Sequence, residues 1–262
     1  DSGLYGQFLR KQAEKAGVVR TEGKIEHVQR DEESGYITAL QLQSGQQIEG
    51  DLFIDCTGQR GLLIKQTLGV EFESWHEYLP ADTALAVPSE RFEHTLPYTR
   101  SIAHTAGWQW RIPLTHRNGN GLVYSSAYLS DDDAHQTLMS NLETKALDEP
   151  RKISFQTGRT AQQWHKNVVS VGLASGFLEP LESTSIHLIQ SAVVRLLKMF
   201  PNDGVGQSTI DAYNAESKTE FETIADFIIL HYHVNARQDS DFWKDRRNMA
   251  IPPRLQHKIA LF

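Results

Sequence analysis

A carboxylate and two hydroxyl side chains follow a small-residue turn in residues 172–187. Glu182, Thr184 and Ser185 stand there at the start of a predicted helix. Small residues let backbone approach a ligand closely, and free amides at a helix start favour an anion or an electron-rich carbonyl. The segment would therefore suit a flavin ring edge or a halide. The alternative is a turn whose glycines only permit tight packing, with Glu182 only complementing the helix dipole.

A second candidate is the aromatic segment 107–113. Trp108, Trp110 and Ile112 alternate with other residues, so a strand here places all three on one face. On spacing alone, two tryptophans on one face of a strand indicate an aromatic stripe of the core.

The third candidate follows an uninterrupted apolar run at residues 52–56. Such a run predicts a strand buried on both faces, as in a parallel sheet, and Thr57 and Gly58 end it. Cys56 is the only cysteine, and we predict a small core residue rather than a nucleophile. One cysteine excludes an internal disulfide and suits a reducing cytoplasm.

Helices and strands alternate irregularly around these segments. Apolar spacings of three and four predict helices at 4–16, 131–147, 183–200 and 209–233, with Gly17 ending the first. Short β-rich runs predict strands at 18–20, 24–30, 36–42, 52–56, 83–88, 108–114, 121–128, 153–158 and 168–171. The pattern predicts a mixed α/β (α+β) fold.

Two of the candidate segments resemble one family closely. Residues 179–184 are similar to the Glu-Pro-Leu-Glu-Ser-Thr stretch of the flavin-dependent tryptophan halogenases, and residues 107–113 contain that family's WxWxIP signature. Residues 51–64 and 231–262 are also similar to it, so the resemblance covers essentially the whole chain. It implies a partial two-dinucleotide-fold FAD domain at 1–65, a β-rich substrate domain at 66–165, an FAD- and halide-binding strand-turn-helix at 166–205 and a helical region at 206–262.

The resemblance implies that reduced FAD and oxygen oxidise chloride or bromide to hypohalous acid, which halogenates tryptophan or a related aromatic. Glu182 would be catalytic, while Thr184 and Ser185 would hold the halide. Trp108 and Trp110 would lie near the flavin without being catalytic. The cofactor-binding residues implied by the matched positions are Ile25, Thr57, Gly58, Gly172, Leu173, Ala174, Gly176 and Ile186.

The sequence departs from the family at two residues and lacks two of its elements. Ser185 stands where several tryptophan-acting members have glycine, and Gln59 replaces a common phenylalanine. The glycine-rich dinucleotide fingerprint and the lysine that carries the activated halogen have no counterpart in these 262 residues. We therefore expect the chain to be the middle of a longer enzyme and to be inactive alone. A flavin monooxygenase of the same superfamily and an inactive remnant remain alternatives.

Charge and hydropathy limit the partners. A net charge of -7 without clustered Lys and Arg argues against nucleic acid, and no run is long enough to span a membrane. A metal site at His231 and His233 is not expected, because a spacing of two directs helical side chains apart. The resemblance implies an aromatic small-molecule substrate and a separate flavin reductase, and it leaves a homodimer open. The single cysteine leads us to expect a cytoplasmic location.

Overall fold

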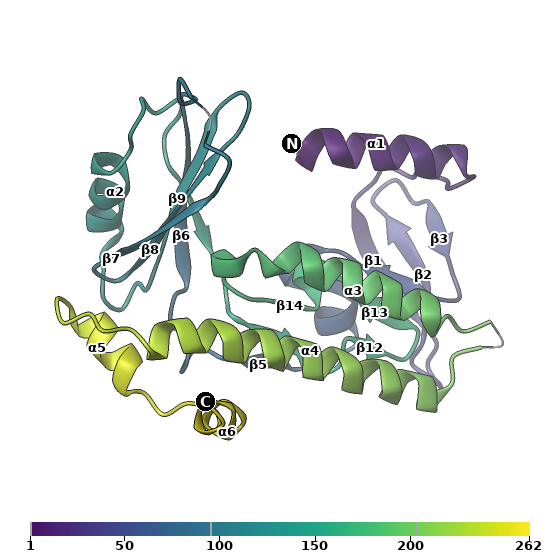
Figure 1. Cartoon of the computed structure of the whole chain (residues 1–262). Coiled ribbons are helices and arrows are strands. Elements are labelled where there is room, and N and C mark those ends of the chain that lie inside the picture. The colour runs from purple at the N-terminus through teal and green to yellow at the C-terminus, as the bar shows by residue number, and fades with distance from the viewer. Residues whose placement is uncertain (1, 95, 203) are drawn as a thin grey trace. The chain divides into compact units, whose positions relative to one another are not determined.

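The computed structural model describes residues 2–94, 96–202 and 204–262. The chain divides into two compact units, residues 1–53 and 54–262 (Figure 1), and each is described by itself. Both helices and sheets are present, so the predicted mixed α/β class is confirmed. The four-part division expected from the sequence remains a prediction.

The first unit contains one helix and a three-stranded antiparallel sheet. Helix α1 (Ser2–Lys15) precedes strands β1 (Ile25–Arg30), β2 (Ile37–Leu42) and β3 (Gln47–Glu49), in the order β1-β2-β3. Gly17 adopts φ +95° after α1, as the predicted helix end requires. The predicted strand at 18–20 is wrong. Val19 is 87% exposed there, and the segment belongs to no strand.

The second unit is built around a five-stranded antiparallel sheet in the order β10-β6-β9-β8-β7. Its alternate side chains serve two cores. One face packs against helix α2 through Leu122, Tyr124 and Leu138, and the other contributes Trp108 and Val123 to the larger core shared with the C-terminal helices (Figure 1). The elements of this layer are β6 (Thr83–Ser89), β7 (Arg100–His104), β8 (Gly107–Pro113), β9 (Asn118–Tyr124), α2 (Asp131–Ser140) and β10 (Arg151–Ser154).

The sequence did not predict β7, and it extended α2 too far. The predicted helix at 131–147 ends at Ser140, where Asn141 adopts a non-helical conformation. Ser130 caps its start by accepting a hydrogen bond from the Asp133 amide. The chain beyond the helix returns to the sheet, and Leu147 donates its amide to the Pro88 carbonyl.

Two further three-stranded sheets carry the turns of interest, in the orders β14-β11-β5 and β12-β13-β4. Strand β13 is fully buried in the middle of its sheet. Ile54 in β4 is 43% exposed and Cys56 is exposed, so neither the strand buried on both faces nor the core cysteine was predicted correctly. The strands are β4 (Phe53–Asp55), β5 (Phe72–Ser74), β11 (Gly158–Thr160), β12 (Trp164–His165), β13 (Val168–Ser170) and β14 (Gly176–Phe177).

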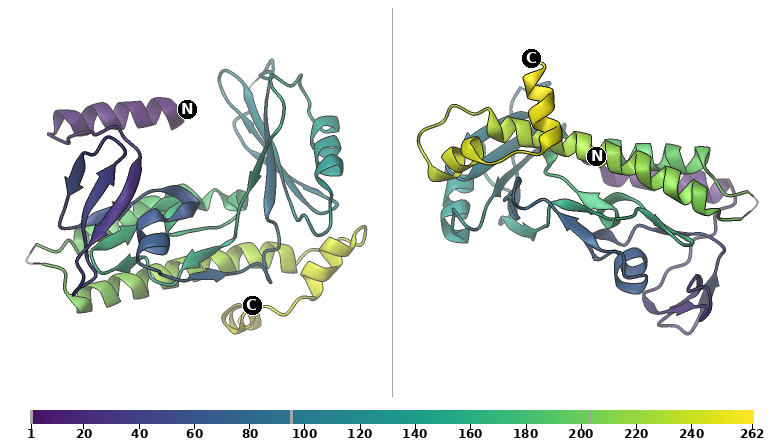
Figure 2. Two further views of the ribbon diagram at one scale, coloured as in Figure 1. Left: turned by 180° about the vertical axis from the view of Figure 1, so that it is seen from behind. Right: turned by 90° about the horizontal axis from the view of Figure 1, so that it is seen from below.

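Four helices complete the second unit. Helices α3 (Thr184–Lys198) and α4 (Gln207–His233) run side by side, as both figures show (Figures 1 and 2), and both were predicted. Helices α5 (Asp241–Asn248) and α6 (Pro253–Ala260) were not predicted individually. Asp226 of α4 accepts hydrogen bonds from Arg254 and Lys258, which hold α6 against α4. Among the described residues, none of the helices has the length and apolar character needed to cross a membrane.

Candidate functional site

Two glycine-containing turns lie against each other at the start of the site. The short helix η1 (Gly58–Arg60) packs beside η3 (Gly172–Ala174), so segments more than a hundred residues apart in sequence meet there. Gly58 and Gly172 have φ values of +74° and +68°, which glycine adopts without strain. A Cβ on Gly58 would meet nothing within 4 Å, and Leu173 is 44% exposed. The two turns therefore form an open, partly apolar surface.

Gly176 has a different role from Gly172. At φ +152°, a Cβ there would lie 2.6 Å from the Gly158 carbonyl oxygen and 2.8 Å from the Arg159 Cα. Glycine is required because two backbones pass closely, and Ala174 is likewise fully buried. The packing role of glycine, left open by the sequence, therefore holds for Gly176. Cofactor contact by Gly176 and Ala174 remains a prediction.

Helix α3 begins at Thr184, one residue after the predicted start at 183. Ser183 precedes it in the left-handed conformation, φ +55°, and does not cap the helix with its side chain. The amides of Thr184 and Ser185 occupy the first turn, where backbone N–H groups have no partner within the helix. Thr184 Oγ1 is buried and has no hydrogen-bond partner among the described residues. Donors for an anion are therefore available, while Ile186 is 68% exposed beside them.

Glu182 ends the short helix η4 (Pro180–Glu182) and points to α4. Its Oε1 lies 3.0 Å from Nε2 of His231, whose Nδ1 lies 2.7 Å from the Phe227 carbonyl oxygen. Both partners of the ring are acceptors, so both contacts are hydrogen bonds only when the imidazole carries two protons. His231 was not expected to take part in the site. The geometry makes it the group that orients the Glu182 carboxylate.

The two tryptophans of β8 belong to the core. Trp108 is buried, Trp110 is half-buried, and their ring centroids lie 6.1 Å apart. The Trp110 ring occupies the space above Gly121 of β9, where an added Cβ would lie 1.9 Å from the nearest indole carbon. The core reading of the aromatic stripe is therefore confirmed for Trp108. Ile112 is exposed at the end of the strand, and proximity of the tryptophans to flavin remains a prediction.

A buried carboxyl group links these elements. Glu179 is fully buried, and its Oε2 accepts hydrogen bonds from Trp108 Nε1 at 3.2 Å and from the Tyr232 hydroxyl at 2.5 Å. Burial raises the pKa of Glu179 to about 7, although both hydrogen bonds favour the charged form. Burial and the neighbouring Glu179 also raise the pKa of Tyr232. The Oε2 atom of Glu179 therefore links strand β8 and the end of α4 to the turn before α3.

The raised pKa of Glu179 predicts a pH-dependent stability. The folded protein holds this proton more tightly than the unfolded chain, whose carboxyl has a pKa near 4.5. The contribution is therefore fully present below about pH 4.5 and is lost as pH rises through about 7. Between pH 4.5 and 8, the unfolding free energy of the unmodified protein should fall by on the order of 3 kcal/mol more than that of the Glu179→Gln variant. Urea unfolding of both proteins across that range measures it, and parallel curves would contradict it.

A small aromatic cavity lies next to this cluster. It has a volume of about 240 Å³. Trp108 and Tyr232, which donate hydrogen bonds to Glu179, line it together with His231, the partner of Glu182. Its lining residues are Ser101, Ala103, Trp108, Leu181, His231, Tyr232, Asn235, Arg237 and Trp243. Asn235 donates to the carbonyls of Tyr232 in α4 and Trp243 in α5, and Arg237 pairs with Asp239, so the polar groups of both side chains already have partners. Three of the other lining residues are aromatic.

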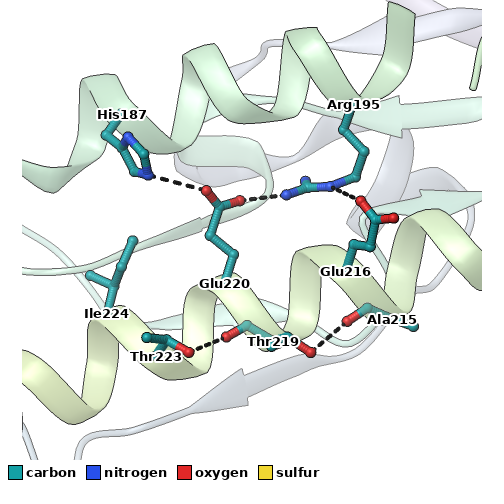
Figure 3. Close-up of a pocket in the computed structure, with 8 residues that line it drawn as sticks. All are labelled: His187, Arg195, Ala215, Glu216, Thr219, Glu220, Thr223 and Ile224. Carbon is teal, nitrogen blue, oxygen red and sulfur yellow. Dashed lines mark hydrogen bonds and ion pairs between the residues drawn. The ribbon is translucent and has the colours of Figure 1, made fainter. Parts of the chain in front are cut away.

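A larger groove between α3 and α4, of about 620 Å³, has a different character (Figure 3). Arg195 pairs with Glu220 at 2.5 Å and with Glu216 at 3.4 Å, and His187 lies 3.2 Å from the other oxygen of Glu220. These charges already satisfy one another, so the groove serves to join two helices. His187 is 64% exposed on the rim of this groove.

Two sequence candidates have different surroundings. The Thr57 amide and hydroxyl both donate to Asp55, whose other oxygen accepts the Leu63 and Ile64 amides at the start of η2 (Leu62–Thr67). Asp55 therefore organises this turn, a role that the sequence analysis missed. Ile25 lies in the first unit, on β1. Contact of Thr57 or Ile25 with a cofactor remains a prediction.

Comparison with known proteins agrees with this arrangement. The model of the tryptophan halogenase family matches residues 1–262, and the chain belongs to that family. The recognition made from the two motifs is thereby confirmed.

Individual relatives support the assignment along the whole chain. Tryptophan 6-halogenase SttH from Streptomyces toxytricini is 38% identical over 99% of this chain and 50% of its own length. The structure of BrvH, a flavin-dependent halogenase from Brevundimonas sp. BAL3, is 50% identical with a TM-score of 0.97, covering 100% of this chain and 54% of that one. A flavin-dependent halogenase from Xanthomonas campestris is 52% identical with a TM-score of 0.98, covering 100% and 53%. The chain thus spans about half the length of the relatives it matches.

Proposed function

We propose that the whole protein is a flavin-dependent halogenase that oxidises a halide to hypohalous acid and halogenates tryptophan or a related aromatic compound. The observation that carries this proposal is the junction at residues 179–185. The amides that start α3, the paired Glu182 and the wall of an aromatic cavity all belong to this one short segment or contact it. A separate flavin reductase would supply the reduced cofactor.

The residues present fit the ring of a flavin. Leu173 and Ile186 expose apolar side chains on neighbouring elements, and Gly58 leaves open space beside them. A flat, largely apolar ring would be favoured over such a surface because contact removes apolar area from water. Reduced FAD, when bound, supplies two electrons that, with two from the halide, reduce oxygen to water and hypohalous acid. The glycine-rich fingerprint that would hold its pyrophosphate has no counterpart in these residues.

The start of α3 fits a halide. Thr184 and Ser185 present amides at the positive end of the helix dipole, and Thr184 Oγ1 is buried without a partner among the described residues. A halide ion would accept hydrogen bonds from these donors. We infer that Thr184 and Ser185 form the halide-binding site.

Glu182 supplies negative charge on the substrate side. Halogen transfer to an aromatic carbon creates positive charge on the ring before the ring proton leaves. A carboxylate fixed by His231 would stabilise that charge or orient the electrophile. The aromatic cavity would hold the ring, because it is smaller than the usual drug-sized pocket and is lined by Trp108, Tyr232 and Trp243.

Thr184→Val tests the halide site. Valine keeps the shape of the side chain and removes a hydroxyl that has no partner among the described residues, so stability should not fall. In the whole protein we expect the KM for bromide to rise about tenfold, the effect of one lost hydrogen bond to a charged group, while the KM for the aromatic substrate stays unchanged.

Ser191→Ala is the matched control, because it removes a hydroxyl two turns further along the same helix. It should leave the bromide KM unchanged. An unchanged bromide KM in Thr184→Val as well would remove Thr184 from the site.

A further inference from the structure

We propose that Glu179 is a positioning residue of this site, which joins the cavity walls at Trp108 and Tyr232 to the turn that carries Glu182. This inference rests on the proposed function and adds to it a residue behind the cavity. Glu179 is fully buried, so it reaches the reaction only through its neighbours.

The hydrogen bonds of Glu179 account for the first part of the proposal. Trp108 comes from β8 and Tyr232 from α4, and both donate to the same oxygen, Oε2. Both residues also line the aromatic cavity. One acceptor atom therefore fixes two cavity walls that come from distant parts of the chain.

The path of the chain accounts for the second part. Glu179 precedes η4, and Glu182 ends it, so only one short turn separates the two carboxyl groups. His231 and Tyr232 are consecutive residues on α4. His231 contacts Glu182, and Tyr232 donates a hydrogen bond to Glu179. Two parallel contacts thus fasten the turn to the end of α4. Loss of the first should loosen the second.

The unused oxygen argues against a role in stability alone. Among the described residues, Glu179 Oε1 has no hydrogen-bond partner and no cation faces this carboxyl. Burying a carboxyl group without a neighbouring cation costs stability, and the donors of Trp108 and Tyr232 need only one acceptor oxygen. The amide oxygen of a glutamine at this position could therefore accept both hydrogen bonds, whereas an apolar side chain could accept neither.

Tyr232→Phe and Tyr213→Phe form a matched pair for the test in the whole protein. Both tyrosines are fully buried on α4, and the Tyr213 hydroxyl donates to the Ala192 carbonyl, away from Glu179. Tyr232→Phe should lower the kcat for halogenation about fivefold or more and leave the bromide KM within twofold. Tyr213→Phe should change neither. Equal kcat losses in both variants would overturn the proposal.

Two substitutions of Glu179 distinguish the effect of its hydrogen-bond acceptor from the effect of its charge. Glu179→Gln keeps an acceptor and should retain kcat within about threefold, whereas Glu179→Leu should lose tenfold or more at an unchanged bromide KM. A leucine variant that performs as well as the glutamine variant would contradict positioning by hydrogen bonds.

A measurement independent of turnover keeps the inference distinct from the proposed function. The indole N–H proton resonance of Trp108, identified by its loss in Trp108→Phe, should move upfield in Glu179→Leu and stay in place in Tyr213→Phe. An unmoved resonance in Glu179→Leu would overturn the link. If the unmodified protein shows no halide-dependent turnover, the proposed function fails, while this resonance still decides whether Glu179 holds Trp108.

Discussion

Glu182→Gln in the whole protein is expected to reduce the kcat for halogenation by about 100-fold or more, the usual effect of removing one preorganised electrostatic group. The substitution removes the charge and changes the volume little. Binding of FAD should remain nearly unchanged, because the turns at Gly58 and Gly172 are separate from the contact between Glu182 and His231. Steady-state turnover and a flavin fluorescence titration measure the two quantities.

Glu216→Gln is the matched control for this experiment. Glu216 is an exposed carboxylate on α4 that lies 3.4 Å from Arg195, and its loss should leave turnover within about twofold. Full turnover in Glu182→Gln would show that Glu182 is not catalytic and only complements the dipole of α3. Loss of FAD binding in the same variant would show that the turn, rather than the charge, had been disturbed.

Gly121→Ala is expected to destabilise the protein by about 1–3 kcal/mol, the cost of overpacking a filled core. The added Cβ would lie 1.9 Å from the Trp110 ring, so the indole or strand β9 must move. Trp110 is half-buried over this glycine and packs against the core that contains Trp108. Chemical unfolding measures the loss, and the native tryptophan emission should change with it.

Gly119→Ala on the same strand provides the control. Gly119 pairs with Ile112 of the neighbouring strand β8, and its Cβ would come no closer than 3.4 Å, to the flexible end of Arg117. That substitution should be neutral or stabilise by a few tenths of a kcal/mol, because alanine loses less conformational freedom than glycine. Equal destabilisation by both substitutions would mean that Trp110 does not rest on Gly121.

Local patterns predicted the parts of the fold that local forces determine. The apolar period predicted a helix over 183–200, close to the observed bounds of α3, and the period of two predicted the strand that carries Trp108 and Trp110. These patterns succeed because a helix or strand must turn its apolar side chains toward one core. Motif resemblance then supplied the family.

Long-range contacts were not predictable in the same way. Glu179 binds partners 71 and 53 residues away, and neither spacing has a sequence signature. The Glu182 contact with His231 was missed because the two histidines at the end of α4 were considered only as metal ligands. Ile54 and Cys56 were expected in a core because their segment is apolar, but burial depends on what covers the strand.

The central claim is tested most directly by incubating the whole protein with reduced FAD, oxygen, bromide and an indole substrate, followed by mass spectrometry of the product. We expect a brominated product, recognisable by the paired isotopes of bromine. Its formation should depend on bromide concentration and be strongly reduced in Glu182→Gln. A product that has gained only an oxygen atom, at a rate independent of bromide, would contradict the account and would assign the protein a monooxygenase activity.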